Sequence, residues 1–450
     1  MRQDWSAFAT ANVPRYTNYP TAAQFSDSVG REDVRRWARD TAQDTPISAY
    51  VHVPFCEALC WYCGCHTTVP NGYGRIETYV STVHREIDLW AEALGRHGGV
   101  GHLHFGGGSP NALSPDDFFA LTEHVRRSLR VKDNAEIAVE LDPRSLTSER
   151  VEAMAAVGVN RASLGVQTLD LMVQKAVNRI QPREMVRDCI EALRIAGISA
   201  VNIDLMYGLP HQTVADMVDM AEFCAKNGVS RVAVFGYAHV PWFAKHQRAI
   251  DEAALPGLKE RALQAEAAAR ALISWGYERI GLDHFAMPDD PLAVAAREGR
   301  LRRNFQGYTD DPFETLVGIG PSSISQFRGG SVQNVRRTDH WSEAVHDGRL
   351  PTDRGVRVSA DDRLRARVIE ALMCTLLVDL EAMCAEMGAD AGAFDGALAY
   401  LEPLEAAGIC RVQGCVVTVD PKARMLVRNV AQAFDDYCVR DGAGRHAVAV

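Results

Sequence analysis

The sequence lacks the features that mark membrane, secreted and nucleic-acid-binding proteins. No uninterrupted apolar run reaches the roughly 20 residues of a membrane-spanning helix, and the start of the chain, Met1–Trp5, carries no apolar signal core. There is no long basic block and the net charge is −10, so we expect no nucleic-acid partner and no membrane partner. The single triple glycine lacks the G-x-x-x-x-G-K-[ST] pattern of a phosphate-binding loop.

The cysteines do not form a secreted disulfide framework. Eleven is an odd number, and seven of them are scattered along residues 189–438 of a 450-residue chain. Apolar residues make up 47% and charged residues 24% of the chain, which is the ordinary balance of a globular protein with two or three domains. We therefore expect a protein of the reducing cytoplasm.

The other four cysteines stand within ten residues, at Cys56, Cys60, Cys63 and Cys65. Thiolates are soft ligands, and such density suits iron–sulfur chemistry. The first three have C-x3-C-x2-C spacing. Three protein thiolates on a four-iron cubane leave one iron with a free coordination position, and an open position is what lets a metal do chemistry.

Two simpler interpretations of these cysteines compete with an iron–sulfur cluster. Positions 56, 60 and 63 would share one face of a helix, where buried cysteines act as small apolar side chains, although Pro54 and Gly64 favour a loop. A structural zinc site usually takes two separated cysteine pairs, and no C-x2-C partner lies downstream. The spacing alone favours metal or cluster binding over buried packing.

Short β-branched segments alternate with amphipathic helical stretches between residues 46 and 240. A series of β-then-α units predicts a parallel sheet, because parallel strands need crossover connections. Gly158, Gly197 and Gly228 stand where the end of a helix favours positive φ, just before the next strand. Periodicity does not separate an open doubly wound sheet from a partial barrel. The predicted strands are Ser48–Phe55, His102–Phe105, Glu136–Leu141, Arg161–Val166, Val201–Met206 and Arg231–Phe235.

Polar or glycine-rich residues fall at one end of these predicted strands. The cysteines follow the first strand and Gly106–Pro110 follow the second. Glu140, Gln167 and Asp204 lie in or just after the next three strands, and Ala238 follows the sixth. In parallel α/β folds ligands bind at the carboxyl ends of the strands. The coincidence predicts one shared binding site.

Each of these residues also has a structural interpretation. The glycines suit close backbone approach to an amino or carboxylate group, or simply a tight turn. Glu140 and Asp204 would accept hydrogen bonds from ribose hydroxyls or an amine, or form ion pairs with neighbouring arginines. Arg179 would clamp a ligand carboxylate or lie on a solvated helix face. The neutral candidates would contact a nucleoside or stay structural: Gln167, Tyr50 and Tyr62.

The chain divides into three parts. Residues 1–45 form an N-terminal arm in which Val13–Thr21 predicts extended structure. Residues 46–350 hold the β/α units and an extension with one further strand, Tyr277–Leu282. Residues 351–450 predict a small, mostly helical C-terminal domain of winged-helix type. Its expected elements are helices near Leu364–Leu380 and Ala391–Ala407 and a strand pair near Cys410–Val419.

These motifs resemble those of the radical S-adenosylmethionine enzymes and, within them, of the oxygen-independent coproporphyrinogen III oxidases. The first three cysteines and Gly-Gly-Gly-Ser-Pro carry the broader resemblance, and Cys65 narrows it. The similarity spans nearly the whole chain. The other matching motifs are Pro14–Thr21, Val177–Arg179, Asn202–Pro210, Asp283–Ala286, Arg303–Tyr308 and Arg428–Val430.

The resemblance implies a partial (β/α)6 TIM-like barrel with a 4Fe–4S cluster on Cys56, Cys60 and Cys63 and two molecules of S-adenosylmethionine. It implies oxidative decarboxylation of two propionates of coproporphyrinogen III to vinyl groups by a 5′-deoxyadenosyl radical, giving protoporphyrinogen IX in haem biosynthesis. An electron donor and an electron acceptor are implied but not identified. Cys65 is expected near the site, in a catalytic role rather than as a cluster ligand. The implied ligand-contact residues are Tyr50, Tyr62, Gly107, Gly108, Ser109, Glu140, Gln167, Arg179, Asp204, Ala238 and Ile324.

The chain departs from the family pattern in a few places. Ser109 stands for the usual threonine, and Thr375–Leu377 for Asn-Phe-Arg, which puts substrate closure by the C-terminal domain in question. The alternative function is a haem-binding chaperone of the same superfamily, but such relatives generally lack the fourth cysteine and the arm. We expect a monomer. Because a substrate with four carboxylates needs cations, we expect substrate contacts from Arg15, Lys245, Arg248, Arg302 and Arg303.

Overall fold

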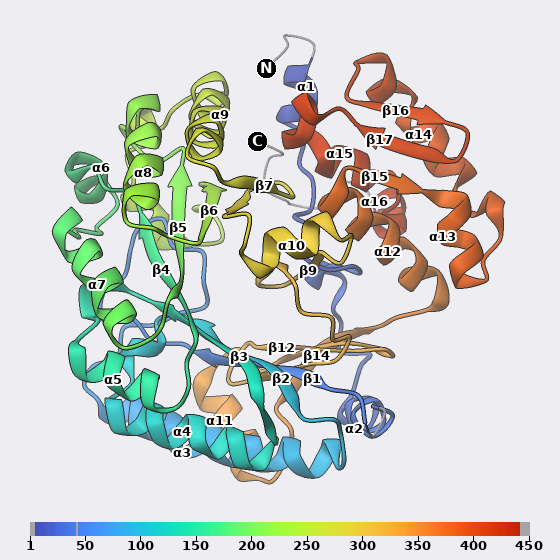
Figure 1. The fold of residues 1–450 in the computed structure, drawn as a ribbon. Coiled ribbons are helices and arrows are strands. Elements are labelled where there is room, and N and C mark those ends of the chain that lie inside the picture. The colour runs from blue at the N-terminus through green and yellow to red at the C-terminus, as the bar shows by residue number, and fades with distance from the viewer. Residues whose placement is uncertain (1–4, 42–43, 442–450) are drawn as a thin grey trace.

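The computed structural model of the chain describes residues 5–41 and 44–441. The chain start Met1–Asp4, where no signal core is expected, lies outside the described residues, as do residues 42–43 of the arm and 442–450 of the C-terminal domain. None of the described helices has the length and apolarity to cross a bilayer. A partly open barrel faces a C-terminal lobe, and the N-terminal arm runs between them (Figure 1).

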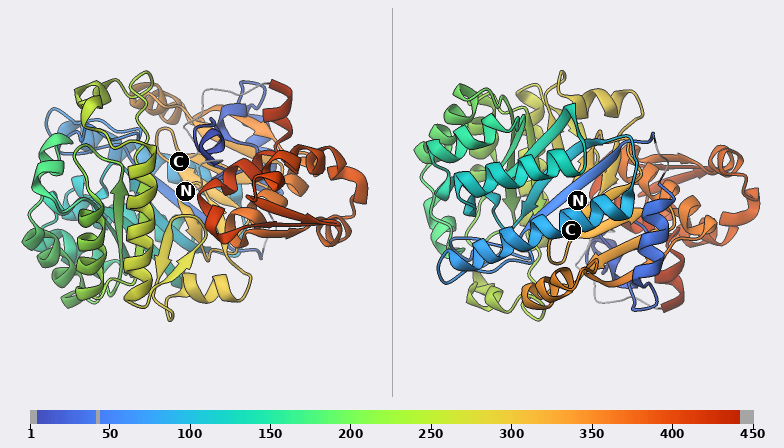
Figure 2. Two further views of the ribbon diagram at one scale, coloured as in Figure 1. Left: turned by 90° about the horizontal axis from the view of Figure 1, so that it is seen from above. Right: turned by 90° about the horizontal axis from the view of Figure 1, so that it is seen from below.

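The framework is a 12-stranded sheet in the order β14-β13-β12-β11-β1-β2-β3-β4-β5-β6-β8-β7. Neighbouring strands from β11 to β6 are all parallel. The sheet curves with helices along its outer face, so the partial barrel is confirmed and the open doubly wound sheet is wrong (Figure 2). The predicted strands are confirmed as β1 Ile47–Val53, β2 Val100–Gly107, β3 Val131–Leu141, β4 Arg161–Gln167, β5 Ala200–Tyr207 and β6 Arg231–Gly236.

Amphipathic helices cover the outer face of the barrel strands. Three of them end at the glycines predicted from the sequence, because Gly158, Gly197 and Gly228 adopt φ values of 80°, 89° and 59°. Each glycine turns the chain back toward the amino end of the next strand, so the carboxyl ends share one rim of the barrel. The helices are α3 Gly74–Leu94, α4 Pro115–Ser128, α5 Ser148–Ala156, α6 Leu171–Ala176, α7 Arg183–Ile195, α8 Val214–Lys226 and α9 Leu258–Ser274.

The extension holds more strands than the single one predicted. β7, Glu278–Ile280, confirms that strand and pairs antiparallel with β8, His284–Ala286, at the β6 edge. At the opposite edge β11, Leu316–Ile319, adds a parallel partner to β1. These strands are only three or four residues long, which is too short for an alternation of apolar residues to mark them in the sequence. The remaining elements are β9 Arg302–Asn304, β10 Gly307–Thr309, β12 Ile324–Phe327, β13 Gly330–Asn334, β14 Thr352–Arg357, α10 Pro291–Arg297 and α11 Thr338–His346.

The C-terminal lobe begins with α12, Ala360–Thr375. This helix ends earlier than predicted, because Leu376 adopts a φ of 64° and the chain turns into β15, Leu377–Asp379. The predicted strand pair is confirmed, and β15 joins it in a three-stranded sheet. The winged-helix type stays a proposal for this lobe. The other elements are α13 Leu380–Met387, α14 Asp395–Ala406, β16 Cys410–Gln413, β17 Val416–Val419, α15 Val427–Gln432 and α16 Asp436–Asp441.

The N-terminal arm packs into the hydrophobic core of the C-terminal lobe. Trp5 Nε1 donates to the Ala407 carbonyl at 2.8 Å, and Tyr16 Oη donates to Asp435 Oδ2 at 3.0 Å. The predicted extended stretch Val13–Thr21 contains no helix and is fully described. The arm therefore reaches its place through contacts with the far end of the chain. Its helices are α1 Ser6–Ala9 and α2 Arg31–Arg39.

Candidate functional site

The clustered cysteines occupy the loop that follows β1. The stretch between β1 and α3 is described in full and contains no helix, so packing of the cysteines on one helical face is wrong. Backbone hydrogen bonds fix the loop, from Cys56 N–H to the Thr68 carbonyl and from Trp61 N–H to the Val177 carbonyl, both at 3.0 Å. Cys60 is buried and Cys65 is exposed. We call this segment, residues 54–68, the cysteine loop.

The sulfurs of the cysteine loop accept hydrogen bonds. Thr67 Oγ1 donates to Cys56 Sγ at 3.1 Å, and the Cys65 N–H donates to Cys63 Sγ at 3.4 Å. A hydrogen bond from the Cys65 side chain lowers the pKa of Cys63 to about 6, whereas burial raises the pKa of Cys56 to about 11. Donors aimed at sulfur stabilise bound thiolates, so this set of side chains fits a thiolate-ligated cluster. Across the described residues, no three or more His, Cys, Asp or Glu side chains are arranged so that they could hold a metal ion.

Two arginines converge on Cys60. Arg144 Nη2 and Arg179 Nη1 each lie 3.3 Å from Cys60 Sγ. Asp142 pairs with both, at 2.6 Å from Arg144 Nη2 and 3.2 Å from Arg179 Nη1. Arg179 is 5% exposed and also donates to the Gly165 carbonyl, so its interpretation as part of a solvated helix face is wrong. Sequence reasoning missed Arg144, although it follows the strand-end motif directly.

Glu140 anchors a polar network inside the barrel. It accepts hydrogen bonds from His104 Nε2 at 3.0 Å and from the Gly107 N–H at 3.2 Å. Burial would raise the pKa of Glu140, but the hydrogen bond and charge of His104 and the hydrogen bond from the Gly107 N–H together outweigh it and hold this pKa below its usual value. Tyr50 Oη lies 3.2 Å from His52 Nδ1, and burial raises the Tyr50 pKa. Glu140 is thus a charged acceptor held at the strand ends.

Asp204 has neutral neighbours instead of a cation. Ser163 Oγ donates to it at 3.1 Å and Asn202 Nδ2 at 2.9 Å. Within the described residues, neither Asp204 nor Glu140 forms the arginine ion pair that the structural interpretation predicted. Burial raises the pKa of Asp204 to about 6.

This raised pKa predicts a pH-dependent stability for the ligand-free protein. The folded state holds the Asp204 proton more tightly than the unfolded state, whose pKa is near 3.8. The stabilisation is full below about pH 4 and is lost as pH rises through about 6, an effect of up to about 3 kcal/mol. We expect Asp204→Asn to remove it, so that the variant gains stability relative to the parent between pH 4 and pH 7. Urea unfolding at several pH values measures the difference, and a constant difference would contradict the prediction.

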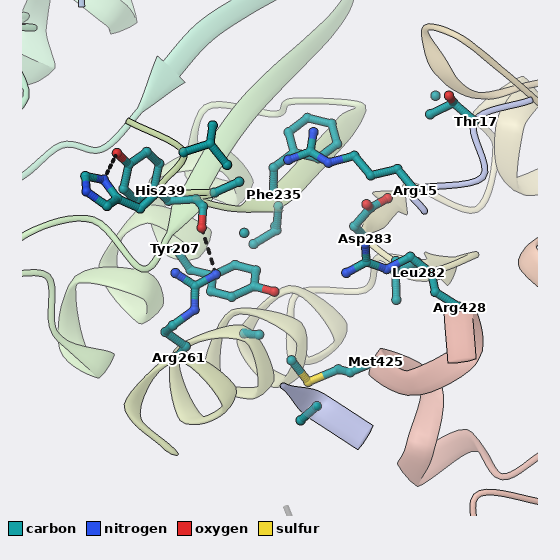
Figure 3. Close-up of a pocket in the computed structure, with 18 of the residues that line it drawn as sticks. Arg15, Thr17, Tyr207, Phe235, His239, Arg261, Leu282, Asp283, Met425 and Arg428 are labelled. Carbon is teal, nitrogen blue, oxygen red and sulfur yellow. Dashed lines mark hydrogen bonds between the residues drawn. The ribbon is translucent and has the colours of Figure 1, made fainter. Parts of the chain in front are cut away.

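Two adjoining cavities open beside the cysteine loop. The inner cavity, about 810 Å³, is lined by Cys63, Cys65 and residues from the ends of β4, β5 and β6. The outer cavity, about 1040 Å³, lies between the barrel, the arm and the C-terminal lobe (Figure 3). Both are lined by Arg15, Cys65 and Ala238, so they meet next to the cysteine loop. The inner cavity also brings together the predicted Tyr62, Gln167 and Asp204.

A smaller polar cavity of about 250 Å³ inside the barrel is lined by both Glu140 and Asp204. The rest of the predicted set lines none of these three cavities. Gly107 is the last residue of β2 and Gly108 begins the turn after it, where a side chain would clash with the Phe55 carbonyl at 2.5 Å. Ile324 lies two strands from β1, in β12. The others in this group are Tyr50, Ser109 and Arg179.

The cations of the outer cavity differ from those predicted. Arg15 and Arg303 line it as expected. Arg302 pairs with Glu370 of α12 at 3.0 Å instead, and Lys245 and Arg248 line none of the three cavities. Sequence reasoning missed the further arginines of this cavity, because they come from segments far apart in the chain. They are Arg261, Arg279 and Arg428.

The cysteine loop at the rim of a partial barrel defines a class of enzyme. The profile of the Radical SAM superfamily matches residues 50–224. Membership implies a 4Fe–4S cluster and S-adenosylmethionine as cofactors, and the donor set of the cysteine loop fits such a cluster.

Comparison with whole proteins narrows the class. The chain is 46% identical to oxygen-independent coproporphyrinogen III oxidase of Bradyrhizobium diazoefficiens over 100% of both chains. It is 38% identical to the enzyme of that name from Paracoccus denitrificans, over 98% of this chain and 97% of the other. The solved structure of coproporphyrinogen III oxidase (HemN) from Escherichia coli, described as a radical SAM enzyme, superposes with a TM-score of 0.90 at 34% identity, covering 95% of this chain and 100% of that one. The chain belongs to the family of oxygen-independent coproporphyrinogen III oxidases.

Proposed function

We propose that this chain converts coproporphyrinogen III to protoporphyrinogen IX by oxidative decarboxylation of two propionates, without oxygen. The observation that carries the proposal is the continuity of the site. The cysteine loop contributes Cys63 and Cys65 to the inner cavity, which meets the larger outer cavity at Arg15 and Ala238. A macrocycle in the outer cavity would present one edge to a nucleotide in the inner cavity. The substrate named for the relatives supports the same reaction.

In this proposal Cys56, Cys60 and Cys63 hold the cluster, and two molecules of S-adenosylmethionine bind beside it. When bound, these cofactors supply the 5′-deoxyadenosyl radical that takes a hydrogen atom from the β-carbon of a propionate. Each propionate then becomes a vinyl group by losing CO2 and one electron, which an external acceptor must take. The fold keeps this chemistry inside cavities shared by three parts of the chain, which limits contact of the intermediate with water.

The protein side chains position the ligands. Glu140 and Asp204 are partly buried acceptors that suit ribose hydroxyls or an amine. Cys65 is exposed and lines both cavities, where it would contact the substrate, so we keep it as a catalytic candidate. The other proposed contacts are Tyr50, Tyr62, Gly107, Gly108, Ser109, Gln167, Arg179, Ala238 and Ile324.

We further propose a monomer that works in the cytoplasm with a separate electron donor and electron acceptor. One chain supplies the barrel, the arm and the lobe that line the outer cavity, so no second copy is needed to complete it. All eleven cysteines are free, which suits a reducing compartment.

An anaerobic assay tests the proposal. The cluster is reconstituted, and S-adenosylmethionine, a reductant and coproporphyrinogen III are added. We expect protoporphyrinogen IX together with 5′-deoxyadenosine, and no product when the nucleotide is omitted. A fully assembled cluster without product would contradict the proposal, and stoichiometric haem binding without turnover would favour the chaperone.

A further inference from the structure

The outer cavity concentrates positive charge in an acidic protein. The chain carries a net charge of −10, yet this cavity is lined by five arginines and a single acid, Asp283. Between the arginines lie apolar side chains such as Phe235, Leu282 and Met425. A large apolar wall with several cations suits a flat hydrophobic ligand that carries several carboxylates. The arginines are Arg15, Arg261, Arg279, Arg303 and Arg428.

The five arginines do not have the same freedom to bind a ligand. Arg261 donates to the Tyr237 carbonyl at 2.8 Å. Arg303 donates from Nε to the Tyr16 carbonyl at 3.1 Å, and its buried Nη1 has no hydrogen-bond partner among the described residues. Arg279 lies over the ring of Phe285 at 5.8 Å, and its Nε is buried without a hydrogen-bond partner among the described residues. A buried donor without an acceptor costs free energy unless a bound ligand accepts its hydrogen bond.

Arg428 is the arginine that the C-terminal lobe contributes to the outer cavity. It lies on α15 and converges with Arg15 beside Asp283, with Arg261 across the cavity (Figure 3). Burial and the nearby charge of Arg15 together lower the pKa of Arg428 to about 10. Like charges brought together in a buried site favour an anion between them.

We propose that Arg279 and Arg428 bind the carboxylates of the substrate that do not react, and that Arg15 orients the carboxylate that does. The assignment rests on the proposed function and follows from position. Arg279 and Arg428 line only the outer cavity, whereas Arg15 lines both cavities at the point where Cys65 also lies. The reacting propionate must enter the inner cavity, and the opposite edge of the macrocycle then faces the two other arginines.

Equilibrium binding tests the anchoring pair without turnover. The probe is coproporphyrin III, the oxidised four-carboxylate macrocycle, added to cluster-loaded enzyme without reductant and followed by its fluorescence. Loss of a charge-assisted hydrogen bond weakens binding about 10- to 100-fold, so we expect that loss for Arg279→Gln and for Arg428→Gln. Arg270→Gln is the matched control, because Arg270 is an exposed arginine of α9 paired with Glu266, and it should leave the affinity unchanged.

A second measurement needs no variant. The tetramethyl ester of coproporphyrin III has the same macrocycle but no charge, and we expect the parent enzyme to bind it at least about 100-fold more weakly. Equal binding of the ester and the acid, or parental affinity in both glutamine variants, would overturn the assignment.

The role of Arg15 is tested by coupling, which is the number of vinyl groups formed per molecule of S-adenosylmethionine cleaved, and the variant is Arg15→Gln. We expect this variant to bind coproporphyrin III within a few-fold of the parent, but to cleave S-adenosylmethionine with fewer vinyl groups formed per nucleotide. Unchanged coupling would overturn the role of Arg15. Failure of this assignment and failure of the proposed function can be told apart. If the enzyme forms product but the arginine variants bind coproporphyrin III like the parent, only the carboxylate-binding assignment is wrong. If binding depends on the arginines but no propionate is decarboxylated, the proposed reaction is wrong.

Discussion

Cys60→Ala is expected to abolish both cluster retention and turnover. Cys60 is the buried member of the three spaced cysteines, at 7% exposure, and Arg144 and Arg179 aim donors at its sulfur. With only two thiolates left, the loop cannot hold a cubane that leaves a single iron open. Iron and sulfide should fall from about four each per chain to near zero, and protoporphyrinogen formation should fall to background. Metal analysis, sulfide analysis and the spectrum of the reduced cluster measure the first effect.

Cys415→Ser is the matched control for this variant. Cys415 is a partly buried free cysteine between β16 and β17, far along the chain from the cysteine loop. Its replacement should leave iron content and turnover at the parental level. Retention of a full cluster by Cys60→Ala would mean that another side chain ligates the iron, and the three-thiolate assignment would be wrong. Zinc in place of iron and sulfide in the parent would establish a structural site instead.

Arg179→Met is expected to lower the free energy of unfolding by about 3 kcal/mol. The substitution keeps much of the apolar volume but removes the partner of Asp142, which lies 3.2 Å away and is 12% exposed. Breaking a buried ion pair typically costs 3–5 kcal/mol, and we expect the low end because Arg144 still pairs with Asp142. Denaturant unfolding of the cluster-free protein gives the value directly. The cluster-loaded variant should also lose activity, since Cys60 loses one donor.

A double-mutant cycle separates the pair from its surroundings. Asp142→Asn with Arg179→Met should cost less than the sum of the two single variants, because the second change removes a partner that is already unpaired. Arg187→Met serves as the control, since Arg187 is 57% exposed and its contact with Asp188 is a surface pair worth little. Additive effects of Asp142→Asn and Arg179→Met would show that the two side chains are not coupled.

The barrel strands and their rim were predictable because local patterns mark them. β-branched runs mark the strands, and the parallel topology then places Glu140, Gln167 and Asp204 at the same end. The seventh strand of the parallel part of the sheet, β11, was not predictable. This strand consists only of Leu316–Ile319, and its partner β1 lies far away in the sequence. Pairing over such a distance leaves no local signal.

The same limit applies to the site. The cysteine loop was predictable because its four cysteines are neighbours in sequence, whereas the outer cavity is assembled from the arm, the barrel and the lobe. Arg144 had a local signal, since it follows the motif at the end of β3, but only the structure shows that it reaches Cys60. Arg261 and Arg279 carry no pattern that separates them from solvated surface arginines.

The packing of the arm against the C-terminal lobe has a consequence for how the protein is made. Tyr16 bonds to Asp435, 419 positions further along the chain. At about 5–20 residues per second, a ribosome needs about 20 to 80 s to synthesise the stretch between them. During that time the first aromatic residues of the arm have no lobe to bury them, and the cavity has no Arg428. The barrel can form while translation continues, but the outer cavity is complete only after α15, which carries Arg428, leaves the ribosome.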